Sequence, residues 1–475
     1  MKQKIISIIA VILALTTLAG CSENSSPLTA GVGQSDSSVD STSSTSSTGS
    51  ADPSASDEST SSETSSTDGS VESTPQSNLE SGSPTESYIP SPVEVSSTAG
   101  SSDIQPVEIT ADNMLTSIKL FDVISQDKEN SMFSPLSLNM ALGLLAEGAG
   151  GGSKTALDTY LGTDNYSDFV DGYMQIVESQ YNYISDYDSN WKNVFELANS
   201  FWANKSIPFN EYYKNSLSEK FKAEVRNIDF GNKEKALSEI NGWVSDKTHK
   251  MIPTIINDYS DDIAAVLINT IYFESAWRNE WLINEDDKQT FTLPDGSTKE
   301  LPLMRNSVRN YFENDKATAF SCGYLNGLEF IGILPKETGD FTIESLDIPS
   351  LLESESYEYD VAVSMPRLEF ETEIPLTEAL KAFGLSEIFD ENTADFYGIS
   401  QVALYVSDIL QKTKLELDEN GTKAAAVTAL MVDATSAMPV EREKKAVTFD
   451  RPFAFMIYDS AEDQIVFLGK VTDPQ

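Results

Sequence analysis

The sequence predicts an α+β fold with mostly antiparallel sheets, and two observations support this class. Strand-like runs and runs with helical spacing are mixed from residue 106 to the C-terminus, without a regular strand–helix–strand alternation. This part of the chain, residues 106–475, is also long enough to bury one large hydrophobic core.

The chain begins with the features of an export signal. Lys2 and Lys4 precede an apolar run over residues 5–18, which is short for a membrane span, and small residues lead to Cys21. The ending Leu-Ala-Gly-Cys resembles a bacterial lipobox, which implies that residues 1–20 are removed and that acylated Cys21 anchors the protein in the cell membrane. An ordinary signal peptide with an incidental cysteine is the alternative.

Residues 21–105 are predicted to be a disordered tether. Residues 22–105 hold 13 acidic residues, no Lys or Arg, and about half Ser and Thr. Such a segment cannot bury enough apolar surface to offset the entropy of ordering, and as a coil it reaches roughly 50 Å. We therefore expect an extracellular protein tethered to the membrane, a purpose that a glycosylated stalk would also serve.

Helical spacing occurs in four segments of the folded part. Thr110 or Asp112 can cap a helix that buries residues 114, 115, 118, 121 and 124. A buried helix over residues 140–145 stops in the glycines of residues 148–152. These glycines fail as a phosphate loop, because Ser153 stands where a glycine must precede the lysine. Residues 233–247 and 375–383 are the other helices, and the last one ends at Gly384.

Strand-like runs fill most of the remaining sequence. They are residues 195–204, 225–230, 264–273, 330–335 and 359–363 and a C-terminal pair, residues 449–458 and 465–474. Residues 415–419 alternate with period two, which predicts a further half-buried strand before the Asn420-Gly421 turn.

Residues 423–434 can be read in two ways. As a strand they would place Lys423 and Asp433 on one face, so a one-residue slip in register would bury both charges. As a surface helix they would use the helix propensity of Ala, Leu and Met. The residues alone leave both structures open.

Six segments, in order along the chain, resemble the serpin family of serine protease inhibitors. They are residues 130–152 (NSMFSPLSLNMALGLLAEGAGGG), 264–277 (AAVLINTIYFESAW), 365–368 (MPRL) and 419–426 (ENGTKAAA), with the C-terminal pair FDRPFAFMIY and IVFLGKVTDP. The resemblance spans residues 106–475, a full serpin length. It implies about nine helices around three mostly antiparallel β-sheets, with an exposed reactive-centre loop.

The resemblance also implies a function. A serine-type endopeptidase would cleave the loop, and the loop would insert into the central β-sheet before the acyl-enzyme hydrolyses, leaving a covalent complex. The seventeenth residue counted from Glu419 inclusive places the reactive bond at Thr435-Ser436, to within one or two residues because the loop is long. Small residues there favour elastase-like or subtilisin-like proteases.

Three groups of residues match functional positions of the family. The hinge residues are Glu419, Gly421, Thr422, Ala424, Ala426 and Thr428. The shutter residues, beneath the opening of the sheet, are Ser134, Ser137, Asn269 and Gln411. The breach residues, where insertion begins, are Trp277, Arg367 and Glu419.

These positions carry further expectations. Thr422 should pass from solvent into the sheet during insertion, and the small hinge residues favour an inhibitor over a non-inhibitory serpin that acts as a surface binding module. Gln411 stands where the family usually has a histidine, so we expect no histidine-linked pH switch in opening. Arg367 and Glu419 would form an ion pair, or else be two separately solvated charges.

We do not expect an enzyme, a metal or a cofactor. The chain's one histidine, His249, follows a helix and is expected to be a solvated loop residue, and neither a G-x-S-x-G motif nor a Cys/His zinc cluster occurs. A hydrolase with an unrecognised Ser/Lys or carboxylate site is the alternative. With Cys21 acylated, Cys322 has no disulfide partner, and its apolar run predicts a small buried hydrophobe.

The charge of the chain argues against nucleic acid as a partner. The formal charge is −43, and leaving out the 13 acids of residues 22–105 with Lys2 and Lys4 gives −32 for residues 106–475. The lysines of residues 441–445 lie among acids, in what reads as a solvated loop, and no basic stripe occurs. We expect a monomer whose partners are serine proteases and, through its lipid anchor, the membrane.

Overall fold

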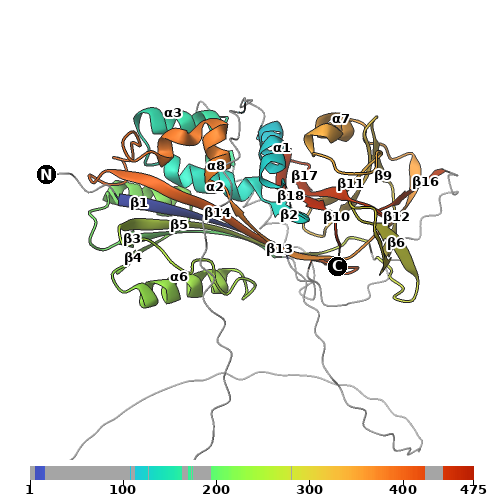
Figure 1. Cartoon of the computed structure of the whole chain (residues 1–475), viewed down its shortest axis with the longest axis horizontal. Coiled ribbons are helices and arrows are strands. Elements are labelled where there is room, and N and C mark those ends of the chain that lie inside the picture. The colour runs from blue at the N-terminus through green and yellow to red at the C-terminus, as the bar shows by residue number, and fades with distance from the viewer. Residues whose placement is uncertain are drawn as a thin grey trace, which may run out of the picture. The chain divides into compact units, whose positions relative to one another are not determined.

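The computed structural model describes residues 6–16, 107, 113–126, 128–162, 170–172, 174, 194–279, 281–422 and 442–474. In this part of the chain, helices surround four β-sheets (Figure 1). Ten of the described strand pairings are antiparallel and four are parallel, in agreement with the predicted α+β class.

The largest sheet has seven strands. Their order is β13 (Leu368–Pro375), β14 (Leu404–Leu417), β1 (Ile6–Thr16), β5 (Ile263–Ala276), β3 (Val194–Asn204) and β4 (Glu224–Ile228), with β15 (Gly421–Thr422) paired beside the end of β5. β1 is parallel to both of its neighbours, β14 and β5. β13 pairs antiparallel with β14 and β3 antiparallel with β5.

β5 is covered on both of its faces. All 14 of its residues are buried. On one face Leu267 and Phe273 belong to the main hydrophobic core, and on the other Val266 and Tyr272 pack in a second cluster with α6 (Lys233–Lys247). Burial on both faces explains why this strand is a continuous apolar run rather than an alternating one.

α2 (Pro135–Ala146) begins directly after β2 (Asn130–Phe133). The hydroxyl of Ser134 accepts a hydrogen bond from the backbone N–H of Ser137 at 3.2 Å, and a proline occupies the first turn. All 12 residues of α2 are buried, so the helix predicted at residues 140–145 is confirmed and begins earlier than expected.

The other described helices are α1 (Asn113–Ile124), α3 (Gly151–Tyr160), α5 (Glu211–Lys220), α7 (Ile348–Glu353) and α8 (Thr377–Leu380). Both α1 and α6 lie where helical spacing predicted them, whereas α3, α5 and α7 were not predicted. α6 spans the predicted residues 233–247. In the described residues, no helix is both long and apolar enough to cross a bilayer.

The predicted helix over residues 375–383 differs in detail. Pro375 is the last residue of β13, and α8 continues beyond its end as an irregular turn, Lys381–Leu385, and a 3₁₀ turn, Ser386–Phe389. Gly384 has a φ of 82°, a conformation that glycine adopts readily. The predicted stop at Gly384 is therefore a kink between two short helical pieces.

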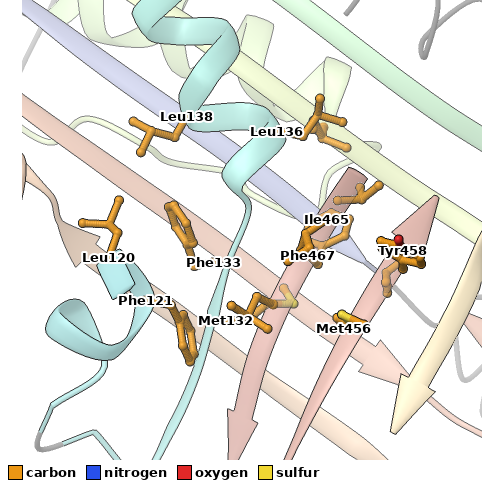
Figure 2. Close-up of a cluster of buried hydrophobic side chains, with 14 of the residues drawn as sticks. Leu120, Phe121, Met132, Phe133, Leu136, Leu138, Met456, Tyr458, Ile465 and Phe467 are labelled. Carbon is orange, nitrogen blue, oxygen red and sulfur yellow. The ribbon is translucent and has the colours of Figure 1, made fainter. Parts of the chain in front are cut away.

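A six-stranded antiparallel sheet contains the C-terminal strand pair. Its order is β2, β18 (Gln464–Val471), β17 (Phe453–Asp459), β11 (Glu329–Pro335), β10 (Ala317–Gly323) and β9 (Asn310–Glu313). Figure 2 shows Phe121 of α1, Phe133 of β2, Leu136 of α2, Met456 of β17 and Phe467 of β18 in one buried cluster. This cluster fixes the position of Ser134, which lies between β2 and α2.

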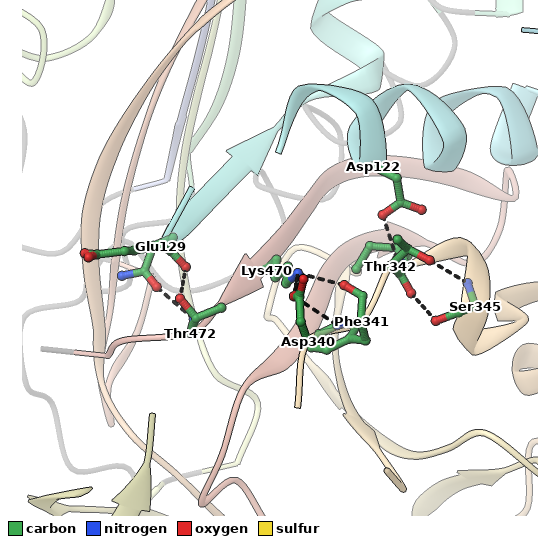
Figure 3. Close-up of polar contacts among 10 residues, drawn as sticks. Asp122, Glu129, Asp340, Phe341, Thr342, Ser345, Lys470 and Thr472 are labelled. Carbon is green, nitrogen blue, oxygen red and sulfur yellow. Dashed lines mark hydrogen bonds and ion pairs between the residues drawn. The ribbon is translucent and has the colours of Figure 1, made fainter. Parts of the chain in front are cut away.

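Polar contacts fasten the first helix and the last strand to one connection of the chain (Figure 3). The carboxylate of Asp122 in α1 accepts hydrogen bonds of 2.7 and 2.8 Å from two backbone N–H groups at the 3₁₀ turn Glu344–Leu346. In β18, Lys470 donates to the carboxylate of Asp340 at 2.6 Å and to the carbonyl of Phe341 at 2.7 Å.

The segment after residue 441 corrects one expectation. β16 (Glu443–Thr448) is a strand, paired parallel with β12 (Tyr359–Met365), which pairs in turn with β8 (Met304–Val308). Lys444 and Lys445 therefore lie in the edge strand of a three-stranded sheet, not in a solvated loop, and charged edge strands resist pairing with other chains. A separate hairpin joins β6 (Lys288–Thr292) and β7 (Thr298–Pro302).

Candidate functional site at the opening of the central sheet

The functional positions inferred from the sequence lie on β5 and β14 and on the segments that contact these two strands. β14 leads into a turn at residues 418–421, after which Thr422 pairs with Ser275 of β5. Some positions lie outside the described residues, namely the bond Thr435-Ser436, the hinge residues Ala424, Ala426 and Thr428, and Cys21. The choice between helix and strand for residues 423–434 lies outside them as well.

Gly421 turns the chain from β14 back toward β5. Its N–H donates to the carbonyl of Asp418 at 3.3 Å, and its carbonyl accepts from the N–H of Asp418 at 3.2 Å. Its φ is 129°, and a Cβ at this position would lie 2.4 Å from the carbonyl oxygen of Ser275. Both the backbone conformation and the available space therefore require glycine.

Thr422 is already inside the sheet in the uncleaved chain. Its side chain is fully buried, and its Oγ1 is hydrogen-bonded to the hydroxyl of Tyr324 at 3.0 Å. The expectation that Thr422 moves from solvent to the interior after cleavage is therefore wrong. The tight turn at Gly421 delivers Thr422 directly to the end of β5, so further insertion would start at Lys423.

Trp277 covers this end of the sheet. Its Nε1 donates to the carbonyl of Asp418 at 2.8 Å, and its ring stacks on Tyr324 with 4.4 Å between ring centroids and an interplanar angle of 12°. The tryptophan thus contacts both the turn and the tyrosine that binds Thr422. Burial raises the pKa of Tyr324, so its hydroxyl stays protonated.

Arg367 and Glu419 form a bidentate ion pair. Nε and Nη2 of the arginine each lie 2.8 Å from a carboxylate oxygen of Glu419, and Nη1 lies 2.8 Å from Glu285. Partial burial acts to raise the pKa of Glu419, but the hydrogen bonds and charge of Arg367 outweigh it and hold this pKa below its ordinary value. Of the two expected arrangements, the structure has the ion pair.

The four shutter residues are buried and form a continuous hydrogen-bonded network. Gln411 of β14 accepts from the backbone N–H of Ser134 at 2.8 Å and donates to its carbonyl at 3.0 Å. The hydroxyl of Ser134 accepts from the N–H of Ser137, and the hydroxyl of Ser137 donates to Asn269 of β5. Asn269 donates in turn to Asn199 of β3 at 2.8 Å. The start of α2 therefore connects β14 to β5.

Gln411 makes both of its hydrogen bonds to Ser134 without a group that titrates near neutral pH. One amide has a fixed acceptor and a fixed donor, and here they meet the N–H and the carbonyl of the same residue, Ser134. None of the four shutter side chains is ionisable in the range from pH 5 to 8.

His249 and Cys322 lie away from this network. His249 is at the end of α6 with its ring centroid 4.3 Å from that of Tyr272 and its Nε2 3.2 Å from Glu196. It lies in a turn with its side chain 44% exposed, so the prediction of a solvated loop residue is confirmed, and one face of its ring rests against the sheet. Cys322 is buried in β10 as predicted, and burial raises the pKa of its thiol to about 12.

Sequence reasoning missed two residues at the breach, as it missed Asn199 at the shutter. Tyr324 supplies the hydrogen bond to Thr422, and Glu285 supplies the second carboxylate for Arg367. Tyr324 follows β10 in a short stretch without a motif, and Glu285 is one acid among several in residues 284–287. Only the fold brings them to the breach. In the described residues, no cluster of His, Cys, Asp and Glu could hold a metal ion.

Comparisons with known proteins cover most of this architecture. A family model described as Serpin (serine protease inhibitor) matches residues 111–474, a range that leaves β1 outside. An uncharacterized serpin-like protein of Methanosarcina acetivorans is 31% identical over 371 residues, which cover 75% of this chain and 85% of that protein. Leukocyte elastase inhibitor A of Mus musculus is 28% identical over 387 residues, which cover 77% of this chain and 100% of that protein.

A solved structure matches as well. The thermophilic serpin tengpin in its native state has a TM-score of 0.62 to this chain at 27% sequence identity. The match covers 78% of this chain and 97% of that one.

Proposed function

Because this chain belongs to the serpin family, a family of serine protease inhibitors, we propose that it inhibits serine-type endopeptidases as a suicide substrate. The protease attacks the loop between β15 and β16, and the loop enters the sheet between β5 and β14 while the protease is still attached. One observation carries the proposal: Thr422 is already paired with Ser275, as the first residue of the strand that insertion would extend.

The length of β5 supports the position proposed for the reactive bond. Each further loop residue would pair one position earlier along β5, starting from Thr422 opposite Ser275. The resulting pairs are Ala424 with Phe273, Thr428 with Asn269, and Ala434 with Ile263, the first residue of β5. Thr435 would then lie just beyond the end of β5. A protease attached to Thr435 would therefore not collide with the paired strands.

The same register places small residues where the sheet is most tightly packed. Directly paired residues point to the same face of a sheet, so Ala424 would join the face of Phe273 in the main core and Thr428 would join Asn269 at the shutter. A charged or bulky hinge residue would have to enter this close-packed space. Thr and Ala fit it at low cost.

The chemistry is acyl transfer followed by a competition between two steps. The protease serine Oγ bonds to the carbonyl carbon of Thr435, the bond to the nitrogen of Ser436 breaks, and the protease histidine passes the serine proton to that nitrogen. Water would hydrolyse the ester and release the protease. Insertion before hydrolysis carries the ester across the molecule and distorts the protease, so the uncleaved chain is held by a kinetic barrier.

The targets we propose are elastase-like or subtilisin-like proteases. Residues 434–437 are Ala, Thr, Ser and Ala, so the loop offers no Arg, Lys or aromatic side chain at the bond to a deep specificity pocket. The similarity to mouse leukocyte elastase inhibitor A is consistent with this class of target. We further propose that acylated Cys21 holds the inhibitor at the outer surface of the membrane.

A protease panel tests the proposal. The chain without residues 1–20 is mixed with elastase-like, subtilisin-like and trypsin-like enzymes, each also in an active-site-blocked form as the control. We expect a complex that survives SDS with the first two classes, and a released peptide that begins within two residues of Ser436. Cleavage without any complex would contradict inhibition, and a peptide that begins at Glu443 would contradict the target class.

A further inference from the structure

The strand β1 occupies the place in the sheet that the loop needs. Figure 1 shows it between β14 and β5, and its backbone pairs parallel with each of them along nearly its full length. Residues 6–15 pair with positions between Leu404 and Lys414, and residues 7–16 pair with positions between Ile263 and Phe273. β1 also lies outside the range that the serpin family model matches.

β1 and the loop would need the same hydrogen-bonding groups of β5. In the register set by Thr422, the loop residues 424–434 would take the positions from Phe273 back to Ile263, which β1 holds in this structure. Of the positions at the end of β5, Ser275 and Ala276 pair with β15. With β1 in place, the loop can therefore extend past Thr422 by no more than Lys423, opposite Glu274.

The strand pairing at the shutter also shows that β1 and the inserting loop would occupy the same place. Ile12 of β1 is the pairing partner of Gln411 on one side and of Asn269 on the other. Asn269 is also the position that Thr428 of the inserting loop would take. β1 thus crosses the point at which the two strands would have to separate for the loop.

The composition of the two segments favours β1 as the occupant. Residues 6–16 contain no charged side chain, whereas the loop would bring Lys423 and Asp433 into the sheet with it. The chain between β1 and α1, residues 17–112, is also long enough for the crossover that a parallel strand requires.

We propose that β1 closes the central sheet to the reactive loop, so that a folded chain that keeps its N-terminal segment cannot insert the loop and is a substrate of proteases instead of an inhibitor. This inference rests on the proposed inhibitory function. Removal of residues 1–20, the step that would also expose Cys21, vacates the position between β5 and β14. Leader cleavage would then activate the inhibitor as well as anchor it.

Proline substitutions in the full chain test the inference. The chain is produced in a cytoplasm that leaves residues 1–475 intact, as verified by mass. In a strand that pairs on both sides, the N–H groups of successive residues point toward opposite neighbouring strands. Proline has no N–H, so Val11→Pro and Ala10→Pro each remove a hydrogen bond to a different neighbour. Val39→Pro is the matched control, because it makes the same substitution outside β1.

Two measurements are made on each chain. The first is hydrogen exchange of the backbone amides of β5 and β14. The second is the melting temperature, measured before and after cleavage within residues 423–441. A metalloprotease makes this cut, because it forms no acyl-enzyme. We expect amides of β5 and β14 to exchange roughly tenfold faster in at least one proline variant. After the cut, that variant should melt about 10 °C or more higher, while the wild type and Val39→Pro gain nothing.

Several outcomes would overturn the inference. The first is that the amides of both proline variants exchange at the rates of the wild type. The second is that the cut wild type gains as much in melting temperature as the cut proline variants. The third is that the melting temperature rises in none of the cut chains. Trapping is scored separately with an elastase-like protease. If a proline variant gains stability after the cut yet forms no SDS-stable complex, the proposed inhibition fails and the closure of the sheet by β1 stands.

Discussion

At the scale of single residues, Thr422 is the position on which the account depends most. It is buried and hydrogen-bonded to Tyr324, and it starts the register that would bring the loop into the sheet. We predict that Thr422→Arg is cleaved at the same bond as the parent but releases the protease. Because an unpaired buried charge is costly, the arginine should leave the sheet in the uncleaved chain, so that insertion after cleavage would have to bury it. About 3 kcal/mol on that barrier slows insertion by over a hundredfold.

The control is the neighbouring substitution, Lys423→Arg. It keeps the charge and lies on the opposite face of the predicted strand, so trapping should be nearly unchanged. Both variants are made in the chain without residues 1–20, and the moles of inhibitor consumed per mole of protease trapped are measured. A covalent complex with Thr422→Arg at the parental ratio would show that the register assigned here is wrong.

Much of the site was predictable at this scale, because its residues belong to short motifs. Trp277, Arg367, Glu419 and Ser134 were identified from their neighbours in sequence. The structure has the ion pair expected of Arg367 and Glu419, and it also shows hydrogen bonds of Trp277 and Ser134 that were not predicted. Tyr324 has no such motif and acts through a ring stack and a hydrogen bond to distant segments. Contacts of this kind depend on tertiary packing, which a local pattern does not contain.

At the scale of elements, the shutter joins α2 to β5 and β14 through groups without a neutral-range pKa. We predict that the rate of loop insertion in His249→Gln, which removes the chain's one histidine, shows no transition near pH 6.5, the ordinary histidine pKa. Adding Gln411→His to this variant should introduce a transition near that pH. A protonated imidazole cannot accept a hydrogen bond from the N–H of Ser134 as the amide does. Below the transition this contact is lost and the strands should separate more readily.

The measurement is the rate of loop insertion after cleavage, followed from pH 5 to pH 8 in both variants. A transition in His249→Gln alone would mean that another group controls opening. Equal profiles in the two variants would mean that Gln411 does not hold the strands together.

Long elements with a strong pattern were predicted well, and several short ones were missed. β5 and α6 appear where their apolar runs and spacing placed them. β8, β9 and β16 have only four to six residues, too few for a period to emerge, and the charges of β16 suggested a loop. Such strands form because a partner strand is adjacent in the fold, not because of their own sequence.

At the scale of the whole molecule, the position of β1 is what the sequence could not indicate. The apolar run at residues 5–18 has the pattern of a leader, and that pattern carries no information about a pairing partner more than 200 residues away. The opening between β5 and β14 depends on the topology of the entire sheet. Any strand that fills it must meet the register of both neighbours.

The central claim is that the cleaved loop becomes a strand between β5 and β14, and the most direct test is a crystal structure of the chain without residues 1–20 after cleavage in the loop. The account predicts that residues 423–434 pair antiparallel with β5, with Thr428 opposite Asn269 and Ala434 opposite Ile263. A cleaved loop that remains outside the sheet, with β5 and β14 paired directly to each other, would contradict it.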